Sequence, residues 1–555
     1  MPRHIDTPLK GQMMDQPLLI QQVIAHAARY HASTEVVSRT LEGAVHRYTF
    51  GDLHRRAQKV ANALEKLGIQ PGDRVGTLAW NGYRHLELYY GVSGSGAVLH
   101  TVNPRLFGEQ IAYIVAHAQD QVVFFDLTFT EQVRALALEC PGVRAFVALC
   151  AEEALPDIAE LQDSGRLLCY ETLLAEAADL YEWPTFDENA ASSLCYTSGT
   201  TGHPKGVLYS HRSTILHALS AGAADRFALT ARDCVAAIVP MFHVNAWGLP
   251  YGCLMAGAKL VLPGPKLEGQ SLHDLMEAEQ VTFSAGVPTV WNAVLQHVDG
   301  KSLRFSSLKR VVVGGATCPP SLQRHFREQH GIEVIHAWGM TETSPLATTN
   351  ALQLQHQSLG LEQRHAVQDK QGNPIYGIDV EIVDEAGQAL AHDGVAAGHL
   401  MVRGAWVASG YYRSEDSAKD GWFATGDVAT LDAHGNVQIT DRSKDVIKSG
   451  GEWIGSIDLE NLATSHPDVL QAACIGVPHS KWDERPLLVV VPRPGVALER
   501  AALLGYFRGK VVRWWEPDDV VFVDSLPIGA TGKILKNVLR AQYKTYRLAT
   551  DPISP

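Results

Sequence analysis

The segment Tyr196–Val207 carries the residues best suited to chemistry and reads Tyr-Thr-Ser-Gly-Thr-Thr-Gly-His-Pro-Lys-Gly-Val. It follows a short uncharged segment, Ala191–Cys195, and combines glycines and small hydroxyl residues with one lysine. Glycines permit positive φ and close backbone approach, so backbone N–H groups, hydroxyls and a cation can surround a polyphosphate. We therefore predict a nucleotide-phosphate loop with the candidate ligands Thr197, Ser198, Gly199, Thr200, Thr201, Gly202 and Lys205.

The order of residues in this loop differs from the common P-loop, in which Lys and then Ser or Thr follow the last glycine. Here Lys205 precedes Gly206. A P-loop nucleoside triphosphatase is therefore disfavoured. A Gly/Thr surface turn without a ligand is the alternative, but the length and consistency of the run favour a nucleotide site.

A second candidate nucleotide motif is His336–Thr343, which reads His-Ala-Trp-Gly-Met-Thr-Glu-Thr and follows a predicted strand. Trp338 offers an aromatic face for adenine, Thr341 can bond the α-phosphate, and Glu342 can hold Mg²⁺. In isolation, such a tryptophan would more often belong to the hydrophobic core, and such a glutamate would more often lie on the solvated surface. Two nucleotide motifs in one chain would be a joint coincidence, so we interpret them as parts of one site.

Three further segments supply what ATP-dependent activation of a carboxylic acid requires, because negative charge crowds the α-phosphorus as the acid attacks. Gly314-Gly-Ala316 predicts backbone that passes close to a ligand. Asp427, in Thr425-Gly-Asp427, can accept hydrogen bonds from both ribose hydroxyls. Lys533, on the Gly/Thr-flanked loop Leu526–Lys533, can bring a mobile positive charge to the α-phosphate and the carboxylate. In isolation, the last two segments would be ordinary turns or surface loops.

Alternating helices and strands must position these loops. An amphipathic pattern over Leu53–Leu67, opened by Thr49-Phe-Gly-Asp52, predicts a helix before the strand Arg74–Trp80. The same order recurs in Glu109–Ala118 before Val122–Asp126, Leu272–Glu279 before Val281–Ala285, and Leu322–His330 before Ile332–Ala337. Because strands alternate with helices, we predict an α/β fold with doubly wound, mainly parallel sheets.

The pattern changes after residue 375, where short segments predict strands separated by Gly/Asp turns: Val380–Val383, His399–Arg403 and Asn436–Thr440. They indicate a small β subdomain that closes the large domain. From Asp441 a compact α+β pattern of about 110 residues follows, which is a normal domain size. We predict a large N-terminal domain over 1–441, a hinge over 442–446 and a small mobile α+β C-terminal domain over 447–555.

Composition limits the class of protein. A chain of 555 residues needs at least two cores, and 46% hydrophobic with 19% charged residues is typical of a globular protein. The net charge of −13 argues against nucleic-acid binding. The eight cysteines contain no Cys-x-x-Cys pair, so we expect buried thiols in a reducing compartment. Met1–Leu19 lacks the apolar core of a signal peptide, and Pro250 and Lys259 interrupt the longest apolar stretch. We expect a cytoplasmic protein with peripheral membrane contact at most.

The order of these motifs resembles that of the AMP-forming acyl-CoA synthetases over nearly the whole chain. Between and after the two nucleotide motifs stand Met241-Phe-His-Val-Asn-Ala-Trp247, Asp441-Arg-Ser-Lys-Asp445 and Gly529–Lys533. The segments Met241–Gly248 and Lys448–Trp453 look most like the fatty-acyl branch. The contexts of Cys195 and His336 look like bacterial medium-chain fatty acyl-CoA synthetases.

The resemblance implies roles for individual residues. Lys533, His243 and Glu342 would be catalytic, and Thr197 and Glu342 would bind Mg²⁺. Ten residues would line the adenylate, hold the ribose or approach the nucleotide from the small domain: Gly315, His336, Ala337, Trp338, Thr341, Asp427, Arg442, Lys444, Lys448 and Trp453.

The resemblance also implies a pivot and a gate. Lys444 matches the hinge position of the family, and His243 matches the residue that orients the carboxylate and admits coenzyme A. Val244 and Trp247 would gate the acyl tunnel. Gly455 and Glu516 depart from the pattern, in which a hydroxyl and an apolar residue are commoner, and this puts the thioester half-reaction in some doubt.

The expected activity is an ATP-dependent ligase that joins a fatty acid to coenzyme A through an acyl-adenylate, with medium-chain acids favoured, near eight to ten carbons, a rough figure. Its co-substrates would be ATP with Mg²⁺ and coenzyme A, and relatives suggest a homodimer. A ligase for a small or methylthio-substituted acid and an enzyme that loads a carrier protein are the alternatives. A non-catalytic fatty-acid-binding protein of the same fold is disfavoured, because a decayed site should have lost some of these groups.

Overall fold

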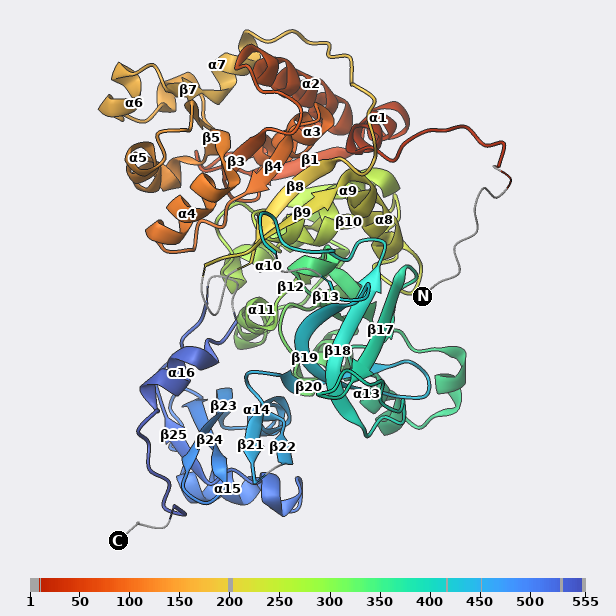
Figure 1. Cartoon of the computed structure of the whole chain (residues 1–555), viewed down its shortest axis with the longest axis vertical. Helices are drawn as coiled ribbons and strands as arrows, with labels where there is room; N and C mark the ends of the chain where they lie inside the picture. Colours follow the sequence, from red (N-terminus) through yellow and green to blue (C-terminus); the bar gives the residue numbers. More distant parts are fainter. Residues whose placement is uncertain are drawn as a thin grey trace.

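The computed structural model describes residues 9, 11–197, 203–415, 418–450, 452–529 and 533–551. These residues form two large β-sheets that are covered by helices, a small antiparallel sheet and a separate C-terminal α+β unit, which Figure 1 shows in blue. The predicted α/β class is therefore confirmed. None of the described helices is both long and apolar enough to cross a lipid bilayer.

The first large sheet has seven strands and is parallel except at one edge. Its strands, in spatial order, are β7 (Leu167–Cys169), β6 (Ala145–Ala148), β5 (Asp120–Phe125), β3 (Arg74–Leu78), β4 (Val98–Thr101), β8 (Ala191–Tyr196) and β9 (Gly206–Ser210). Only β8 and β9 pair antiparallel, with Tyr196 opposite Gly206. The predicted phosphate loop therefore connects the two strands of a hairpin.

The second large sheet has nine strands. Their spatial order is β16 (Asn373–Pro374), β15 (Leu346–Thr349), β14 (Glu333–Gly339), β13 (Arg310–Val313), β12 (Phe283–Gly286), β10 (Cys234–Ala236), β11 (Lys259–Leu262), β1 (Glu35–Arg39) and β2 (Val45–Thr49). The strands from β14 to β1 are parallel to one another. Because the carboxyl ends of parallel strands lie at one edge of a sheet, the loops after β13 and β14 are brought together.

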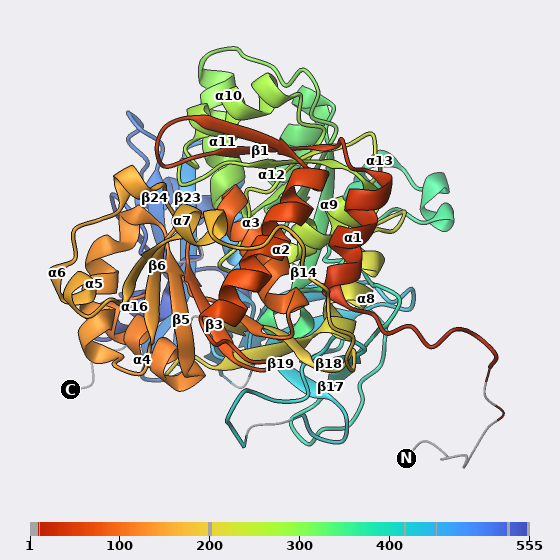
Figure 2. The ribbon, with the colours of Figure 1, turned by 90° about the horizontal axis from the view of Figure 1, so that it is seen from above.

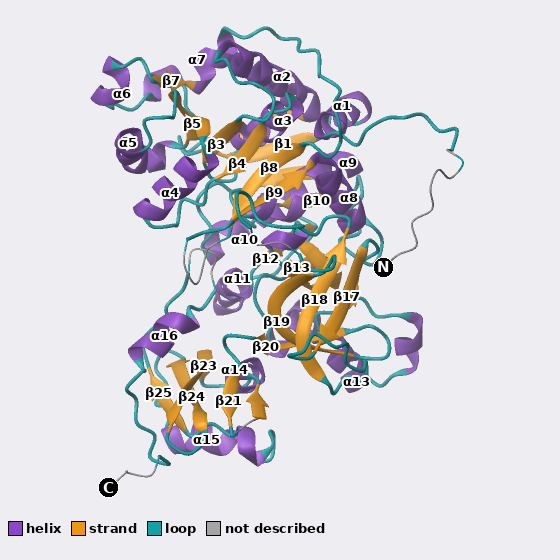
Figure 3. Cartoon of the chain, viewed as in Figure 1, coloured by secondary structure: helices purple, strands orange, loops and turns teal. Residues whose placement is uncertain are grey.

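Helices cover the faces of both sheets, as Figures 2 and 3 show. Those before residue 180 are α1 (Ile20–Tyr30), α2 (Phe50–Lys66), α3 (Tyr83–Gly94), α4 (Gly108–Ala118), α5 (Thr130–Glu139), α6 (Ala159–Asp163) and α7 (Tyr170–Ala175). Those between 200 and 370 are α8 (His211–Gly222), α9 (Leu249–Ala256), α10 (Gly269–Glu279), α11 (Pro288–Gly300), α12 (Pro320–Arg324) and α13 (Leu361–Gln368). The predicted helix–strand order is confirmed at each of its four places, with boundaries shifted by a few residues and with a π-helical turn in place of the second half of the fourth helix.

The start of α2 illustrates how local sequence specifies these elements. Thr49 Oγ1 accepts a hydrogen bond from the Asp52 amide at 3.2 Å, and the Asp52 carboxylate accepts one from the Thr49 amide at 2.9 Å. This capping box satisfies two amides that the first helical turn leaves without partners. Leu53, Ala57 and Leu64 are buried on one face of the helix, as the periodicity predicts.

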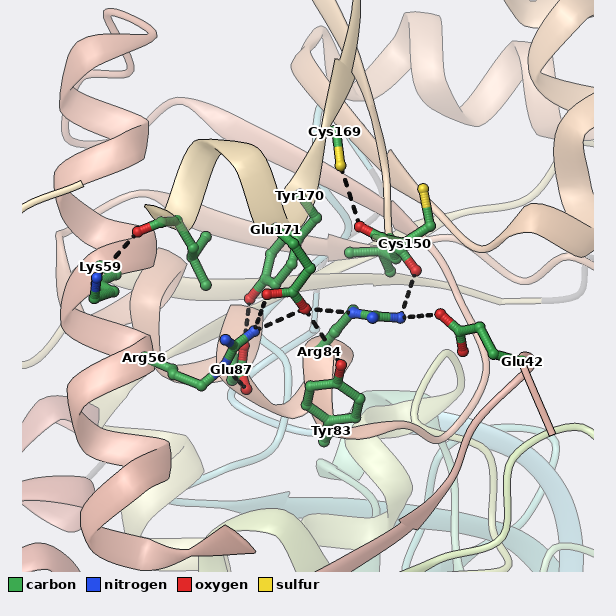
Figure 4. Close-up of polar contacts among 12 residues, drawn as sticks. Glu42, Arg56, Lys59, Tyr83, Arg84, Glu87, Cys150, Cys169, Tyr170 and Glu171 are labelled. Carbon is green, nitrogen blue, oxygen red and sulfur yellow. Dashed lines mark hydrogen bonds and ion pairs between the residues drawn. The ribbon is translucent and has the colours of Figure 1, made fainter. Parts of the chain in front are cut away.

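A buried ion-pair network joins the helices that cover the first sheet, as shown in Figure 4. Arg56 of α2 donates to Glu87 of α3 at 2.7 Å and to Glu171 of α7 at 3.0 Å. Arg84 donates to the same Glu171 at 2.8 Å, and the Tyr170 hydroxyl donates to Glu87 at 2.6 Å. Glu87 is fully buried. Loss of one arginine would leave a buried carboxylate without its charge partner, so this network fixes the register of the three helices.

The small antiparallel sheet contains β17 (Ile378–Val383), β18 (Ala397–Gly404), β19 (Phe423–Leu431) and β20 (Val437–Arg442). The C-terminal sheet contains β22 (Glu452–Ile454), β21 (Ile447–Ser449), β24 (Asp483–Pro492), β23 (Val469–His479) and β25 (Asp519–Phe522). Helices α14 (Ser456–Thr464), α15 (Arg500–Phe507) and α16 (Lys536–Gln542) flank it. Its buried core holds Leu459, Cys474, Leu488 and Phe507. All eight cysteines of the chain are buried free thiols, as expected.

Candidate active site

The hairpin of β8 and β9 holds the ends of the phosphate loop. The Thr197 amide donates to the Lys205 carbonyl at 2.9 Å, and the Lys205 amide donates to Thr197 Oγ1 at 3.2 Å. These bonds close the loop at its base. The intervening candidates Ser198, Gly199, Thr200, Thr201 and Gly202 lie outside the described residues.

Glu342 lies in the loop after β14 with 4% of its surface exposed. Its Oε1 accepts a hydrogen bond from the Tyr411 hydroxyl at 2.6 Å, and the Lys205 ammonium lies 4.8 Å from the centroid of the Tyr411 ring. Burial raises the pKa of the Glu342 carboxyl, while the Tyr411 hydrogen bond and the charges of Lys533 and Arg442 oppose this. A buried carboxylate of this kind gains from a nearby cation, so its chemistry fits Mg²⁺, which prefers oxygen ligands.

The loop after β13 approaches the backbone of β14 closely. A Cβ added at Gly314 would lie 2.9 Å from the Ala337 carbonyl oxygen, and Gly315 adopts a φ of +77°. Both positions therefore require glycine, as predicted for backbone beside a ligand. The neighbouring His336 is buried, with Nδ1 3.1 Å from the Asp369 carbonyl oxygen. Burial lowers the pKa of His336 to about 4, so the ring is neutral at pH 7.

Asp427 links the small antiparallel sheet to the same loop. The Trp338 indole N–H donates to its Oδ2 at 2.9 Å, and Arg442 Nε lies 3.5 Å from its Oδ1. Arg442 stands opposite Asp427 in the pairing of β20 with β19, so strand register brings the two charges together. Burial raises the pKa of Asp427, against the charge of Arg442 and the Trp338 hydrogen bond. The Thr341 carbonyl accepts a hydrogen bond from the Tyr209 hydroxyl at 2.6 Å, which orders the loop.

Lys533 reaches this group from the C-terminal unit. The Gly529 amide donates to the Lys533 carbonyl at 2.7 Å, and the Leu535 amide donates to the Pro527 carbonyl at 2.8 Å, so these bonds hold the backbone of Lys533 in place. Burial lowers the pKa of Lys533 to about 8, assisted by the positive charge of Arg442 and opposed by Asp427 and Glu342. The structure thus brings together a cation and two carboxylates that are distant in the sequence.

His243 and Trp247 lie on an unusual turn before α9. Val244, Asn245, Ala246 and Trp247 all have φ between 47° and 56°. This left-handed conformation costs about 1–2 kcal/mol per residue for L-amino acids, so surrounding contacts must stabilise it. Asn245 Nδ2 supplies one by donating to Ser193 Oγ at 2.8 Å. Sequence periodicity gave no sign of this turn.

The turn places Trp247 against the glycine loop. Trp247 is 9% exposed, and its Cζ2 would lie 3.4 Å from a Cβ added at Gly315. The pKa of the half-buried His243 is lowered to about 3, first by burial and then by the charge of Lys533. The Trp247 indole therefore borders the loop of Gly314 and Gly315, and the neutral His243 imidazole lies within range of the Lys533 charge.

The remaining candidates lie after β20. Burial and the charge of Arg442 lower the pKa of Lys444, while Asp445 and Asp427 oppose this. Lys448 and Trp453 are paired across β21 and β22, with the ammonium 6.0 Å from the ring centroid. Lys448 is exposed. Among the contacts of the described residues, none joins Lys448 or Trp453 to Asp427 or Glu342, so the structure does not bring these two into the site.

Two features of the site escaped sequence reasoning. Tyr411 and Tyr209 fix the Glu342 loop, and the only sequence signal for Tyr411 is its place in the aromatic pair after Gly410.

The departure from the family pattern at Gly455 has a structural reason. A Cβ there would lie 3.0 Å from the Thr440 carbonyl oxygen, so a larger residue would press on the backbone of β20.

Comparisons with known proteins show the family of this chain. The AMP-binding enzyme family matches residues 24–412, and the AMP-binding enzyme C-terminal domain matches residues 458–533. A 3-methylmercaptopropionyl-CoA ligase of Ruegeria lacuscaerulensis is 53% identical over 96% of this chain and 99% of its own length. A medium-chain-fatty-acid–CoA ligase of Ectopseudomonas oleovorans is 50% identical over 96% of this chain and 97% of its own.

Solved structures share the fold. An anthranilate CoA ligase in complex with anthranoyl-AMP has a TM-score of 0.83 at 24% identity, covering 94% of this chain and 97% of that one. The protein therefore belongs to the AMP-binding enzyme family and is an AMP-forming acyl-CoA ligase that uses ATP and coenzyme A.

Proposed function

We propose that the protein converts a medium-chain fatty acid, ATP and coenzyme A into acyl-CoA, AMP and pyrophosphate through an acyl-adenylate. The observation that carries the proposal is the convergence of Lys533 with Glu342 and Asp427, beside the apolar gate residue Trp247. A non-catalytic binding protein would have no use for a buried cation at this position.

In the first half-reaction, the triphosphate lies in the loop between β8 and β9, and the acid carboxylate attacks the α-phosphorus. Lys533 and Thr341 face the charge that develops there, and electrostatic stabilisation of this kind is a large catalytic term. Asp427 and Arg442 hold the ribose, while Gly315, His336, Ala337 and Trp338 surround the adenine. Glu342 and Thr197 would hold Mg²⁺, which supplies positive charge to the leaving pyrophosphate.

In the second half-reaction, the small domain rotates about Lys444 within the hinge 442–446. Lys533 leaves, and Lys448 and Trp453 approach the nucleotide. Among the contacts of the described residues, none joins Lys448 or Trp453 to Asp427 or Glu342, as we would expect before this rotation. The thiol of coenzyme A then attacks the acyl carbonyl and AMP leaves. Domain rotation allows one site to use two sets of groups.

The acid would enter past Val244 and Trp247 with its carboxylate beside His243. The described surroundings of Trp247 are apolar and include Val287 and the glycine loop. An apolar wall selects an aliphatic acid without a charged tail, because burial of an unpaired charge is costly. We place the optimum near eight to ten carbons, since each methylene contributes about 0.8 kcal/mol until the tunnel ends.

A methylthio-substituted acid is the second candidate, and the 53% identity to a 3-methylmercaptopropionyl-CoA ligase favours it. A thioether is soft and apolar, so it packs much as a methylene does. 3-(Methylthio)propionate has the chain length of pentanoate. A preference for this acid would therefore require an acyl tunnel so short that a chain of this length fills it.

Initial rates of pyrophosphate release across saturated acids from propionate to palmitate, with 3-(methylthio)propionate included, test the proposal. We expect kcat/KM to rise by about fourfold per methylene, equivalent to about 0.8 kcal/mol, up to octanoate or decanoate. An optimum at pentanoate that is exceeded by 3-(methylthio)propionate would replace the medium-chain assignment with the second candidate.

We also propose that the boundary of the large domain lies at residue 441, with the small domain over 447–555, and that the protein is a cytoplasmic homodimer. Light scattering of the purified chain would give the mass of two chains. A mass of one chain at all concentrations would contradict the dimer without affecting the proposed chemistry.

A further inference from the structure

Two histidines and an aspartate converge on the surface of the second sheet, on elements that take no part in the proposed reaction. Asp299 is near the end of α11, His325 opens the π-helical turn His325–Gln329 that follows α12, and His330 ends that turn. One ligand atom from each of the three lies within 4.8 Å of the others.

The π-helical turn accounts for the convergence. Its hydrogen bonds run from residue i to i+5, so residues five apart lie on the same face. His325 and His330 have this spacing, and their rings are stacked with centroids 5.5 Å apart and planes at 11°. An α-helix would place the two rings on different faces. Short π segments are costly and are frequent at functional sites.

The ligand atoms lie close enough together for one metal ion to bridge them after local adjustment. His325 Nε2 lies 3.0 Å from one Asp299 carboxylate oxygen, and His330 Nε2 lies 3.5 Å from the other. Bonds of about 2.0–2.2 Å around a tetrahedral Zn²⁺ set neighbouring ligands about 3.3–3.5 Å apart. Because the two ring planes are nearly parallel, the rings would have to rotate for both nitrogen lone pairs to point at one ion.

The two imidazole nitrogens are inaccessible to solvent and share one carboxylate, that of Asp299. Neither His325 Nε2 nor His330 Nε2 makes a hydrogen bond of good geometry, although both lie within ion-pair distance of Asp299, and the His330 side chain is only 9% exposed. A buried polar atom without a partner costs free energy, so each such atom in a native protein needs an explanation. A metal ion at this point would satisfy both nitrogens and the carboxylate together.

We propose that Asp299, His325 and His330 form a binding site for one divalent transition-metal ion of the Zn²⁺ class. Neutral imidazole with a carboxylate suits Zn²⁺, whereas Mg²⁺ prefers oxygen ligands alone. This ion is therefore distinct from the Mg²⁺ that accompanies ATP. With three protein ligands and partial exposure of Asp299 and His325, the fourth position is open to water. The ion ties the end of α11 to the turn that leads into β14.

Calorimetric titration of the metal-stripped full chain with Zn²⁺, without nucleotide, tests the site. We expect the His325→Ala, His330→Ala double variant to lose one Zn²⁺ per chain, or at least about tenfold in affinity for it, because neutral imidazoles are the principal ligands. His392→Ala is the matched control, since His392 is an exposed histidine paired with a single carboxylate, Glu381, at 2.9 Å. It should bind as the parent does.

The number of Zn²⁺ ions bound by the double variant must be subtracted from the number bound by the parent protein. The reason is a second group with close ligand atoms, formed by His273, Asp274 and His297. X-ray absorption of the bound Zn²⁺ should show imidazole and oxygen ligands, and the double variant should lose two imidazoles per chain relative to the parent protein. If the double variant does not fold, the same Zn²⁺ titration is made with the single variants Asp299→Asn and His325→Ala. Both side chains are partly exposed, so their replacement should leave the fold intact. Unchanged stoichiometry and affinity in the folded variants would overturn the proposal.

Discussion

Replacement of Lys533 by methionine removes the positive charge from the site while retaining much of the side-chain volume. We expect this variant to lose acyl-adenylate formation and to keep thioester formation from supplied acyl-adenylate nearly intact. The reason is that, in the proposed mechanism, Lys533 occupies the site in the first half-reaction and leaves it before the second.

The magnitude follows from the electrostatics around Lys533. Burial and Arg442 lower the pKa of Lys533 from 10.5 to about 8. Because one pKa unit corresponds to about 1.36 kcal/mol, these surroundings destabilise the charged form of Lys533 by about 3 kcal/mol when no nucleotide is bound. A bound anionic triphosphate would stabilise the charged form of Lys533 again. Loss of a comparable electrostatic contact typically costs about 10²–10³ in rate. We expect a loss of that size in pyrophosphate release.

The sign of the pH dependence follows from the same pKa. Lys533 must be protonated to act, so kcat/KM for adenylation should fall as the pH rises through about 8. Arginine stays charged over this range. Lys533→Arg should therefore lose the alkaline decline even though its rate is lower, because the guanidinium has a different shape.

The assay separates the two half-reactions. Acid-dependent pyrophosphate release measures the first, and conversion of supplied acyl-adenylate to acyl-CoA measures the second. Lys544→Met is the matched control, since Lys544 is exposed in the same domain. Equal losses in both half-reactions would refute the domain rotation, and no loss in either would refute the role of Lys533.

Three further predictions concern the metal, the gate and the hinge. Glu342→Gln should reduce adenylation by at least about 10² and raise the Mg²⁺ concentration needed, because it removes a buried charge; a Mg²⁺ titration of pyrophosphate release that matches the parent would exclude Glu342 as a ligand. Trp247→Gly should move the preference toward longer acids, measured as kcat/KM for octanoate against palmitate, and an unaltered ratio would remove Trp247 from the gate. Lys444→Pro should retain a single turnover of pyrophosphate release but lose acyl-CoA synthesis, because proline fixes φ near about −65°; parental acyl-CoA synthesis in a folded variant, checked by thermal unfolding, would contradict the pivot.

Local sequence was sufficient where one element contains the whole signal. The capping box at Thr49 and the apolar face of the following segment predicted α2, because both depend on residues within a few turns. Glycines at 314 and 315 were recognised as close-approach positions for the same reason. The helix predicted over Leu322–His330 was only partly correct, since the chain changes to a π-helical turn at His325. Periodicity does not separate these two winding patterns.

Contacts between distant segments could not be predicted from periodicity. Strand β1 pairs with β11, more than two hundred residues later, and β2 extends the sheet beyond it. The position of Lys533 beside Asp427 and Glu342 depends on how two domains meet, which no local pattern encodes. The left-handed turn before Trp247 likewise depends on surrounding contacts that override backbone preference. The family resemblance, rather than spacing, supplied the roles of these residues.

The most direct test of the account uses octanoate that carries heavy oxygen isotope in its carboxylate. The protein, ATP, Mg²⁺ and coenzyme A are incubated with the labelled acid, and the products are analysed by mass spectrometry. An acyl-adenylate pathway transfers one carboxylate oxygen to AMP, so we predict octanoyl-CoA together with AMP that contains one heavy oxygen atom per molecule. Unlabelled AMP, or label in phosphate released with ADP, would contradict the proposed mechanism, and absence of octanoyl-CoA would contradict the proposed substrate.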